Sequence, residues 1–221
     1  MRQPGSEKAK RTLLCYTILI LGLLPVGFAA HYLVQTHGHK LSECRAGKQG
    51  QTQAQISTRL KWAKPIELPG LPNLHKVSDD LYRGAQPSAE GVRQLKNLGV
   101  KTIVNLRLLY SDRDKIRGTS FSYHHIPMAA WHPEDKEVIS FLKIVTDPNC
   151  TPVFVHCQRG AHRTGLMCAV YRIAVQGWSK AEAIDEMTNG EFGFYPGWPN
   201  LIDYTNKLNI EDIKRRAGST E

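Results

Sequence analysis

One ten-residue stretch constrains the fold of this chain more than any other. Residues 156–165 read His-Cys-Gln-Arg-Gly-Ala-His-Arg-Thr-Gly. They follow an apolar run at 152–155 that is typical of a buried strand, and a helical pattern begins at Thr164. The sequence therefore predicts a strand that passes through a tight, glycine-containing loop into the first turn of a helix. We call residues 157–163 the cysteine loop.

A loop of this kind is suited to hold a phosphate group. Consecutive backbone N–H groups at the start of a helix bind anions, and the helix dipole adds to the attraction. Gly160 stands inside the loop, where glycine allows a tight curl. The guanidinium of Arg163 can bind two phosphate oxygens side by side, which lysine cannot do. The predicted phosphate-binding residues are Gln158, Arg159, Gly160, Ala161, His162 and Arg163.

The same surroundings favour covalent catalysis by Cys157. A positive field lowers the pKa of a cysteine thiol from its free value of about 8.5, so the thiolate is populated. The thiolate can attack phosphorus to form a phosphocysteine, which water then hydrolyses. Thr164 can donate its hydroxyl to the leaving sulfur, and His156 is expected to hydrogen-bond backbone atoms of the loop. The alternative is an inert, buried cysteine, against which the flanking histidine and glycine argue.

Strand-like and helix-like segments alternate from residue 81 to the C-terminal region. The expected strands are Leu81–Arg83, Thr102–Leu106, Ser122–Ile126 and Val153–His156. The expected helices cover residues 88–97, 133–147, 164–176, 179–188 and 199–214. Such alternation predicts an α/β fold with a mainly parallel central sheet. Catalytic loops of such folds lie at the carboxyl ends of strands, which is where the cysteine loop falls.

Positive charge is concentrated near the N-terminus. The formal net charge is +9, and residues 1–60 contribute +6 of it, with eight Lys/Arg against two Asp/Glu. This excess flanks an apolar segment and does not cover the folded domain, and aromatic residues are sparse. We therefore expect no nucleic acid as a partner.

The apolar segment covers residues 12–34. Its length suits an uncleaved signal anchor, whereas an apolar core at 13–24 followed by small residues suits a cleaved signal peptide. The mass of the mature protein distinguishes the two. Both interpretations predict a protein that is membrane-anchored or exported to the periplasm, with its catalytic domain outside the cytoplasm.

We expect five consecutive parts along the chain. They are a basic stretch (1–11), the apolar segment (12–34), a flexible glutamine-rich linker (35–64), one catalytic domain (65–215) and a tail (216–221).

Cysteine spacing indicates a single reactive thiol. The sequence has neither C-x-x-C nor zinc-type spacing among its cysteines, which are Cys15, Cys44, Cys150, Cys157 and Cys168. We expect neither a metal nor another cofactor, because no ligand set completes a site around His124 and His125. Cys168 is expected to lie in the core, with a disulfide to Cys157 as the alternative.

Residues 156–165 resemble the signature loop of the cysteine-dependent protein tyrosine and dual-specificity phosphatases. The resemblance extends over residues 75–195 through motifs at 81–87, 126–128 and 171–178, and it points to exported bacterial members. It implies a single domain with a four- or five-stranded sheet flanked by helices. It also implies Cys157 as nucleophile, Arg163 as phosphate clamp, and phosphorylated protein, phosphotyrosine above all, as substrate.

The chain departs from the family at the general acid. The family uses an aspartate before the cysteine to protonate the leaving oxygen, but here Ala129-Ala130-Trp131 occupies those positions. The nearest candidate acids are Asp135, Glu134 and His132, and Asp135 is the one that we carry forward. Glu134 and Asp135 equally fit the first turn of a helix after Pro133, where acidic side chains complement the dipole.

Two other segments could reach the site. Asp112 and Asp114 lie in a charged loop, and we expect both carboxylates to be solvated. The aromatic segment 192–198 could form a rim of the pocket, although a loop packed over the core is favoured.

Three alternatives to a protein phosphatase stay open at this point. Arg159 and His162 resemble residues of plant and fungal phosphatases that act on inositol pyrophosphates, so an inositol (pyro)phosphate or phosphoinositide is the second substrate class. A pseudophosphatase would bind anions without turnover. A sulfur-transfer enzyme also uses a cysteine loop, but Arg163-Thr164-Gly165 argues against it. Without a strong acid, an aryl phosphate or a phosphoanhydride is favoured over an alkyl phosphate.

Overall fold

The structure is a computed structural model that describes residue 57 and residues 59–218. The predicted basic stretch, the apolar segment and most of the linker fall in residues 1–56, outside the described residues. Among the described residues, no helix is both long enough and apolar enough to cross a membrane. The predictions of membrane attachment and export therefore concern a part of the chain that the structure does not describe.

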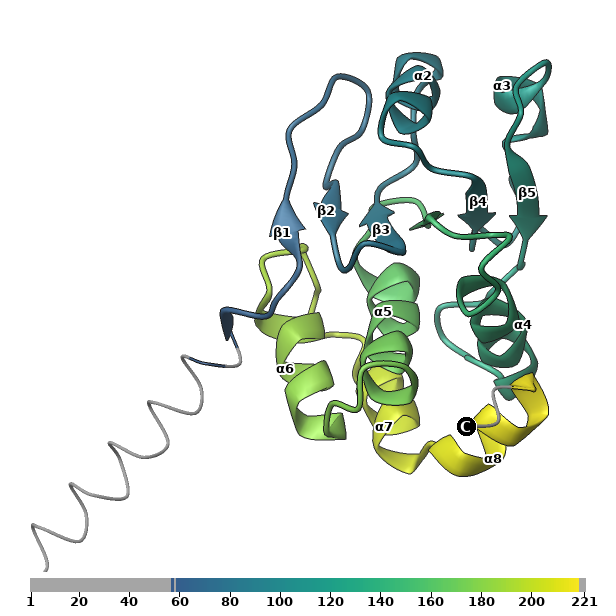
Figure 1. Cartoon of the computed structure of the whole chain (residues 1–221). Helices are drawn as coiled ribbons and strands as arrows, with labels where there is room; N and C mark the ends of the chain where they lie inside the picture. Colours follow the sequence, from purple (N-terminus) through teal and green to yellow (C-terminus); the bar gives the residue numbers. More distant parts are fainter. Residues whose placement is uncertain (1–56, 58, 219–221) are drawn as a thin grey trace, which may run out of the picture. The chain divides into compact units, whose positions relative to one another are not determined.

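A mixed, six-stranded sheet forms the centre of the domain (Figure 1). Its strands are β1 (Lys64–Pro65), β2 (His75–Lys76), β3 (Leu81–Gly84), β4 (Thr102–Asn105), β5 (Ser122–His125) and β6 (Val153–His156). Their order across the sheet is β1-β2-β3-β6-β4-β5. The four predicted strands form its parallel part, and β1 and β2 extend it antiparallel at one edge. The predicted count of four or five strands was wrong because two-residue strands leave no alternating pattern in the sequence.

Helices cover both faces of the sheet (Figure 1). They are α2 (Ala89–Asn97), α3 (Arg113–Ile116), α4 (Asp135–Val145), α5 (His162–Ala174), α6 (Lys180–Asn189), α7 (Pro199–Lys207) and α8 (Ile210–Ala217). Helices α2 and α3 lie on one face, and α4 to α8 lie on the other. Successive side chains of a strand point to opposite faces, so each central strand supplies both cores. In β6, Phe154 packs toward α2 while Val153 and Val155 pack toward α4 and α5.

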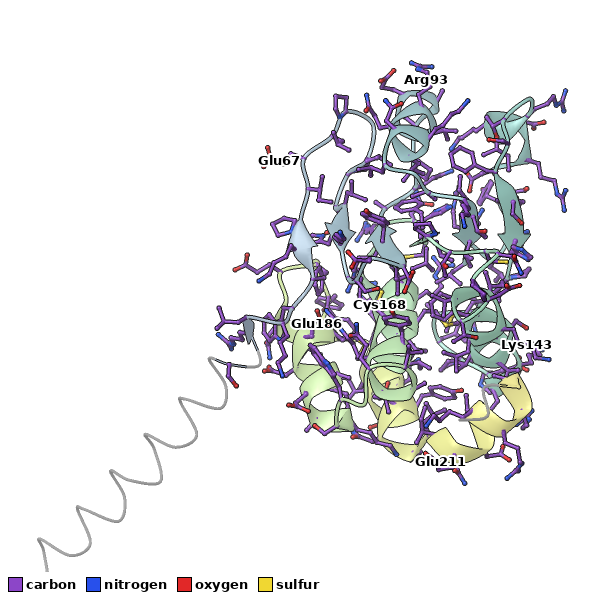
Figure 2. All side chains as sticks on the ribbon, in the orientation of Figure 1. Glu67, Arg93, Lys143, Cys168, Glu186 and Glu211 are labelled. Atoms are coloured by element: carbon purple, nitrogen blue, oxygen red, sulfur yellow. The ribbon has the colours of Figure 1, made fainter. Side chains whose placement is uncertain are left out.

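The interior is mostly apolar and most charged side chains of the helices are exposed, but Glu137 on α4, Arg172 on α5 and Glu186 on α6 are buried. Arg93 on α2 and Glu211 on α8 project away from the domain, whereas Cys168 lies inside it (Figure 2). The side chain of Cys168, on α5, is buried in the hydrophobic core of the domain, as predicted.

Serine side chains cap two of the predicted helices. The hydroxyl of Ser88 accepts a hydrogen bond from the Gly91 amide at the start of α2, at 3.1 Å. Ser179 and Glu182 form a reciprocal capping box at the start of α6. Caps of this kind satisfy backbone N–H groups that the first turn of a helix cannot pair.

Other helix boundaries differ from the prediction. Helix α5 begins at His162, two residues earlier than expected. The segment predicted as one helix over 199–214 is two helices, separated at Leu208 and Asn209. Asn209 caps α8 by accepting a hydrogen bond from the Asp212 amide, and asparagine favours such cap positions over helix interiors. Helix α8 runs to Ala217, into the residues predicted as a tail.

Candidate active site

The cysteine loop joins the carboxyl end of β6 to the N-terminus of α5, as the sequence predicted. Gly160 has a positive φ of +73°, which disfavours any residue with a side chain. A Cβ atom at Gly160 would lie 2.5 Å from the carbonyl carbon of Gly84. The loop can therefore curl against the end of β3 only because this residue is glycine.

Two side chains outside the loop hold its outer turn. Arg83 donates from Nη2 to the Gly160 carbonyl at 2.8 Å, and Asn73 donates from Nδ2 to the Arg159 carbonyl at 2.9 Å. Arg83 is fully buried, and its guanidinium lies 3.5 Å from the ring centroid of Phe192. Arg83 is not among the predicted site residues, although an arginine inside a short buried strand is a signal for a specific role.

The surroundings of Cys157 favour its thiolate. Burial alone would raise the pKa of the Cys157 thiol, but hydrogen bonds from Thr164 and the Arg159 amide, together with the charge of Arg163, lower it below its usual value. The Thr164 hydroxyl is fully buried and makes no other hydrogen bond within the described residues. It is therefore available to the sulfur, whether the sulfur carries charge as attacking or as leaving group.

Backbone carbonyls orient the guanidinium of Arg163. Its Nη1 atom donates to the carbonyls of Leu106 at 3.2 Å and Met128 at 3.3 Å. The buried Nε atom has no partner within the described residues. These contacts fix the plane of the guanidinium and leave donors free for an anion, the arrangement that paired phosphate oxygens require.

Asp112 is buried beneath the loop, so the prediction that its carboxylate is solvated was wrong. Its Oδ2 atom lies 3.1 Å from Nε2 of His156, and Nδ1 of His156 lies 3.2 Å from the Cys157 carbonyl oxygen. Burial would raise the pKa of Asp112, but hydrogen bonds and charge from its neighbours hold it well below its usual range. Three further neighbours each donate a hydrogen bond to the Asp112 carboxylate: Asn105, Gln86 and Lys115.

Only one half of this network, the contact of His156 with the loop, could be predicted from the sequence. His156 contacts the backbone of the loop, as predicted, but its carboxylate partner comes from a segment more than forty residues earlier in the sequence. Asp114, two residues from Asp112, is exposed as predicted. A single turn of the short helix α3 is enough to separate a buried carboxylate from an exposed one.

A pocket of about 270 Å³ opens above the sulfur. It is lined by Ala130, Trp131, Cys157, Gln158, Arg159, His162, Arg163 and Trp198. None of these lining residues is Asp or Glu. Larger hollows elsewhere on the described domain border none of the predicted site residues. Within the described residues, no group of three or more His, Cys, Asp or Glu side chains is arranged to hold a metal ion.

The structure does not bring Asp135 into this pocket. Its carboxylate accepts a hydrogen bond from the Tyr204 hydroxyl at 2.7 Å and lies 3.3 Å from Nη1 of Arg216. Glu134 caps α4 and pairs with Lys136 at 2.7 Å. Both acids therefore have the structural roles at the start of a helix that the sequence analysis weighed against catalysis.

The aromatic segment 192–198 both packs over the core and borders the pocket, the two alternatives predicted for it. Phe192 is buried against Arg83, whereas Trp198 lines the pocket. The Tyr195 amide donates a hydrogen bond to Nε2 of His162 at 3.1 Å. Burial lowers the pKa of His162, and the charges of nearby arginines lower it further.

Comparison with known proteins identifies this arrangement. The family described as DSP-PTPase phosphatase fused to NAD+ Kinase matches residues 72–195. Dual specificity protein phosphatase TpbA of Pseudomonas aeruginosa is 39% identical over 161 residues, which cover 72% of this chain and 72% of TpbA. The chain belongs to the dual-specificity phosphatase family. This dual-specificity phosphatase is an enzyme that hydrolyses phosphate monoesters through a phosphocysteine intermediate.

Solved structures agree with this assignment. The crystal structure of P. aeruginosa TpbA matches the phosphatase with a TM-score of 0.64 and 33% identity, over 72% of this chain and 97% of the other. TpbA has also been crystallised in complex with pTyr. Inositol diphosphatase DSP5 of Arabidopsis thaliana is 30% identical over 125 residues, which cover 52% of this phosphatase and 60% of that relative. The predicted family and the α/β phosphatase fold are confirmed.

Proposed function

We propose that this phosphatase acts on phosphotyrosine in proteins, with Cys157 as its nucleophile and Arg163 as its phosphate clamp. The observation that carries the proposal is the base of the 270 Å³ pocket, where a buried thiol with a lowered pKa lies beside a guanidinium fixed by two carbonyls. The pTyr complex of TpbA supports the choice of substrate.

In this proposal each group of the cysteine loop has one task. The Cys157 thiolate forms a bond to phosphorus as the bond from phosphorus to the tyrosine oxygen breaks. The amides of residues 158–163 and the Arg163 guanidinium hold the phosphoryl oxygens throughout. Water then attacks the phosphocysteine, and the Thr164 hydroxyl stabilises the departing sulfur. His156 and Asp112 keep the loop in shape from below.

The absence of Asp and Glu from the pocket lining supports an aryl substrate. A tyrosine phenol has a pKa of about 10, so it leaves as a phenolate more readily than an alkyl alcohol does. An alkyl leaving group needs a proton in the transition state, and general acids typically contribute about 10²–10⁴-fold to such steps. A pocket whose described lining contains no carboxylic acid therefore favours phosphotyrosine over phosphoserine.

A second substrate class shares the good leaving group. The phosphoanhydride of an inositol pyrophosphate also departs without strong acid assistance, and Arg159 and His162 add donors to the pocket wall. The similarity to a relative named inositol diphosphatase points the same way. The described pocket wall also carries two tryptophans, Trp131 and Trp198, which suit a ring better than a cluster of phosphates.

A substrate panel tests the proposal. We expect kcat/KM for a phosphotyrosine peptide to exceed that for the same peptide with phosphoserine by about 10²-fold or more, because only the alkyl ester needs the missing acid. The panel also contains a phosphoinositide and an inositol pyrophosphate, and phosphate release is measured for each.

Cys157→Ser serves as the blank of the panel, since serine keeps the fold but is a far weaker nucleophile. Equal turnover of the phosphotyrosine and phosphoserine peptides would contradict the argument from the leaving group. A higher kcat/KM for the inositol pyrophosphate than for any peptide would replace the proposed substrate with the second class.

A further inference from the structure

Most of the exposed large apolar side chains of the described domain lie on loops that contact the cysteine loop. The described part of the chain has seven large hydrophobic side chains that are exposed, and five of them lie on three loops that contact the cysteine loop. We call these five the apolar rim; they are Leu108, Leu109, Tyr110, Trp131 and Tyr195. Single exposed apolar residues are ordinary, but a group gathered around one site marks a contact surface.

The first loop of the rim is tied to the active site at both ends. The carbonyl of Leu106 accepts from Arg163, and Asp112 lies against His156 beneath the cysteine loop. Only residues 107–111 lie between these anchors. A chain spans at most about 3.6 Å per residue, so the middle of this loop lies within roughly 10 Å of its anchors.

Contacts of its own hold this first loop in place. Asn105 donates to the Tyr110 carbonyl at 2.8 Å, and the guanidinium of Arg107 lies 4.5 Å from the Tyr110 ring centroid. Even so, Leu109 is 79% exposed and Tyr110 is 61% exposed. The loop thus presents apolar side chains to solvent without burying them in the domain.

The remaining rim residues complete the mouth. Trp131 lines the pocket itself and is 65% exposed. Tyr195 is also 65% exposed, and its amide is bonded to His162 of the pocket wall. Trp131 therefore borders the space above Cys157, and the backbone of Tyr195 contacts a residue that does.

We infer that the apolar rim binds the side chains that flank the phosphotyrosine of an extended polypeptide, so that leucine-like neighbours increase turnover. The inference rests on the proposed function and adds a sequence preference to it. In an extended chain, residues two or three positions from the phosphotyrosine lie about 7–10 Å away, which matches the reach of the first rim loop. An inositol polyphosphate has no apolar side chains with which to cover these groups.

Two matched peptides and two double variants test the inference. One peptide carries leucine two and three positions on both sides of phosphotyrosine, and the other carries serine there. We expect wild type to prefer the leucine peptide by about tenfold in kcat/KM. The variant L109S/Y110S should lose most of that preference and keep its turnover of p-nitrophenyl phosphate, because neither residue lines the pocket.

The control variant is L60S/V175S, which removes the two other exposed apolar side chains of the described domain. Val175 stands at the opposite end of α5 from the cysteine loop, so this variant should retain the full preference. An unchanged preference in L109S/Y110S would overturn the inference, as would a wild type that turns over both peptides equally. A lower molecular mass of L109S/Y110S in solution, with its peptide preference intact, would instead make the rim a contact between copies. If p-nitrophenyl phosphate turnover is normal in any of these cases, the rim inference fails but the phosphatase mechanism is not contradicted.

Discussion

Replacing Arg163 with lysine is expected to lower kcat/KM for p-nitrophenyl phosphate by about 10²–10³-fold, the typical cost of losing one fixed donor to transition-state charge. Lysine keeps the charge but cannot present two parallel N–H groups to a pair of phosphate oxygens. Lysine also has a single nitrogen. Arg163 can use Nη1 for the carbonyls of Leu106 and Met128 and its other nitrogens for the anion. Steady-state kinetics at one pH measure the effect.

Arg159→Lys is the comparison. Arg159 borders the same pocket, yet its side chain is exposed and its amide, which the variant keeps, supplies the contact to the sulfur. We expect its kcat/KM to fall by less than about tenfold. Because lysine keeps the charge at both positions, equal losses in the two variants would contradict the claim that the fixed geometry of the Arg163 guanidinium sets its contribution to turnover.

Asp112→Asn is expected to lower the free energy of unfolding by about 3 kcal/mol at pH 7, which corresponds to a Tm lower by roughly 10 °C. The carboxylate is fully buried and accepts hydrogen bonds from Asn105, Gln86 and Lys115. An amide in its place turns an NH₂ group toward donors and leaves some of them unpaired. Thermal unfolding of both proteins gives the difference.

The same variant has a characteristic pH dependence. The folded pKa of Asp112 lies below the unfolded value of about 3.9, so its ionisation stabilises the fold above that pH and the stabilisation is lost as pH falls. The gap between wild type and Asp112→Asn should therefore narrow below about pH 4. Asp114→Asn, which changes a 91% exposed side chain two residues away in α3, should match wild type throughout. A gap that stays constant down to pH 2–3, or an Asp112→Asn protein as stable as wild type at pH 7, would contradict the assignment.

The sequence contains the parts of the site that are local in the chain. The run at 153–156 has the β-branched, apolar character of a buried strand, and His-Cys followed by Gly160 and Arg163 has one physically sensible arrangement. Helix caps at Ser88 and Ser179 are equally local, since each depends on residues within one turn. These elements could be predicted because their causes lie within ten residues of their effects.

The supports of the loop could not be predicted in this way. Arg83 reaches Gly160 across 77 positions, and Asp112 reaches His156 across 44. Nothing near Asp112 in the sequence separates it from Asp114, because only the packing of α3 buries one and exposes the other. Charged residues that serve a distant loop have the same local pattern as solvated ones.

The lack of an aspartate at the expected position of the general acid, in contrast, is visible in the sequence. In the structure Asp135 contacts Tyr204 and Arg216, and none of the described residues that line the pocket is an acid. Here the sequence and the described geometry agree, and both support the proposed preference for leaving groups that depart unprotonated.

The most direct test of the central claim is to look for the phosphoryl group on the enzyme. Wild type is mixed with p-nitrophenyl phosphate, quenched within a single turnover and analysed by mass spectrometry of its peptides. We expect a transient phosphoryl group on Cys157, which is absent from Cys157→Ser and is still present in Cys168→Ser, a variant that lacks only the buried thiol. Turnover by wild type with no phosphoryl group on Cys157 at any time would contradict it, as would binding of phosphate without any turnover.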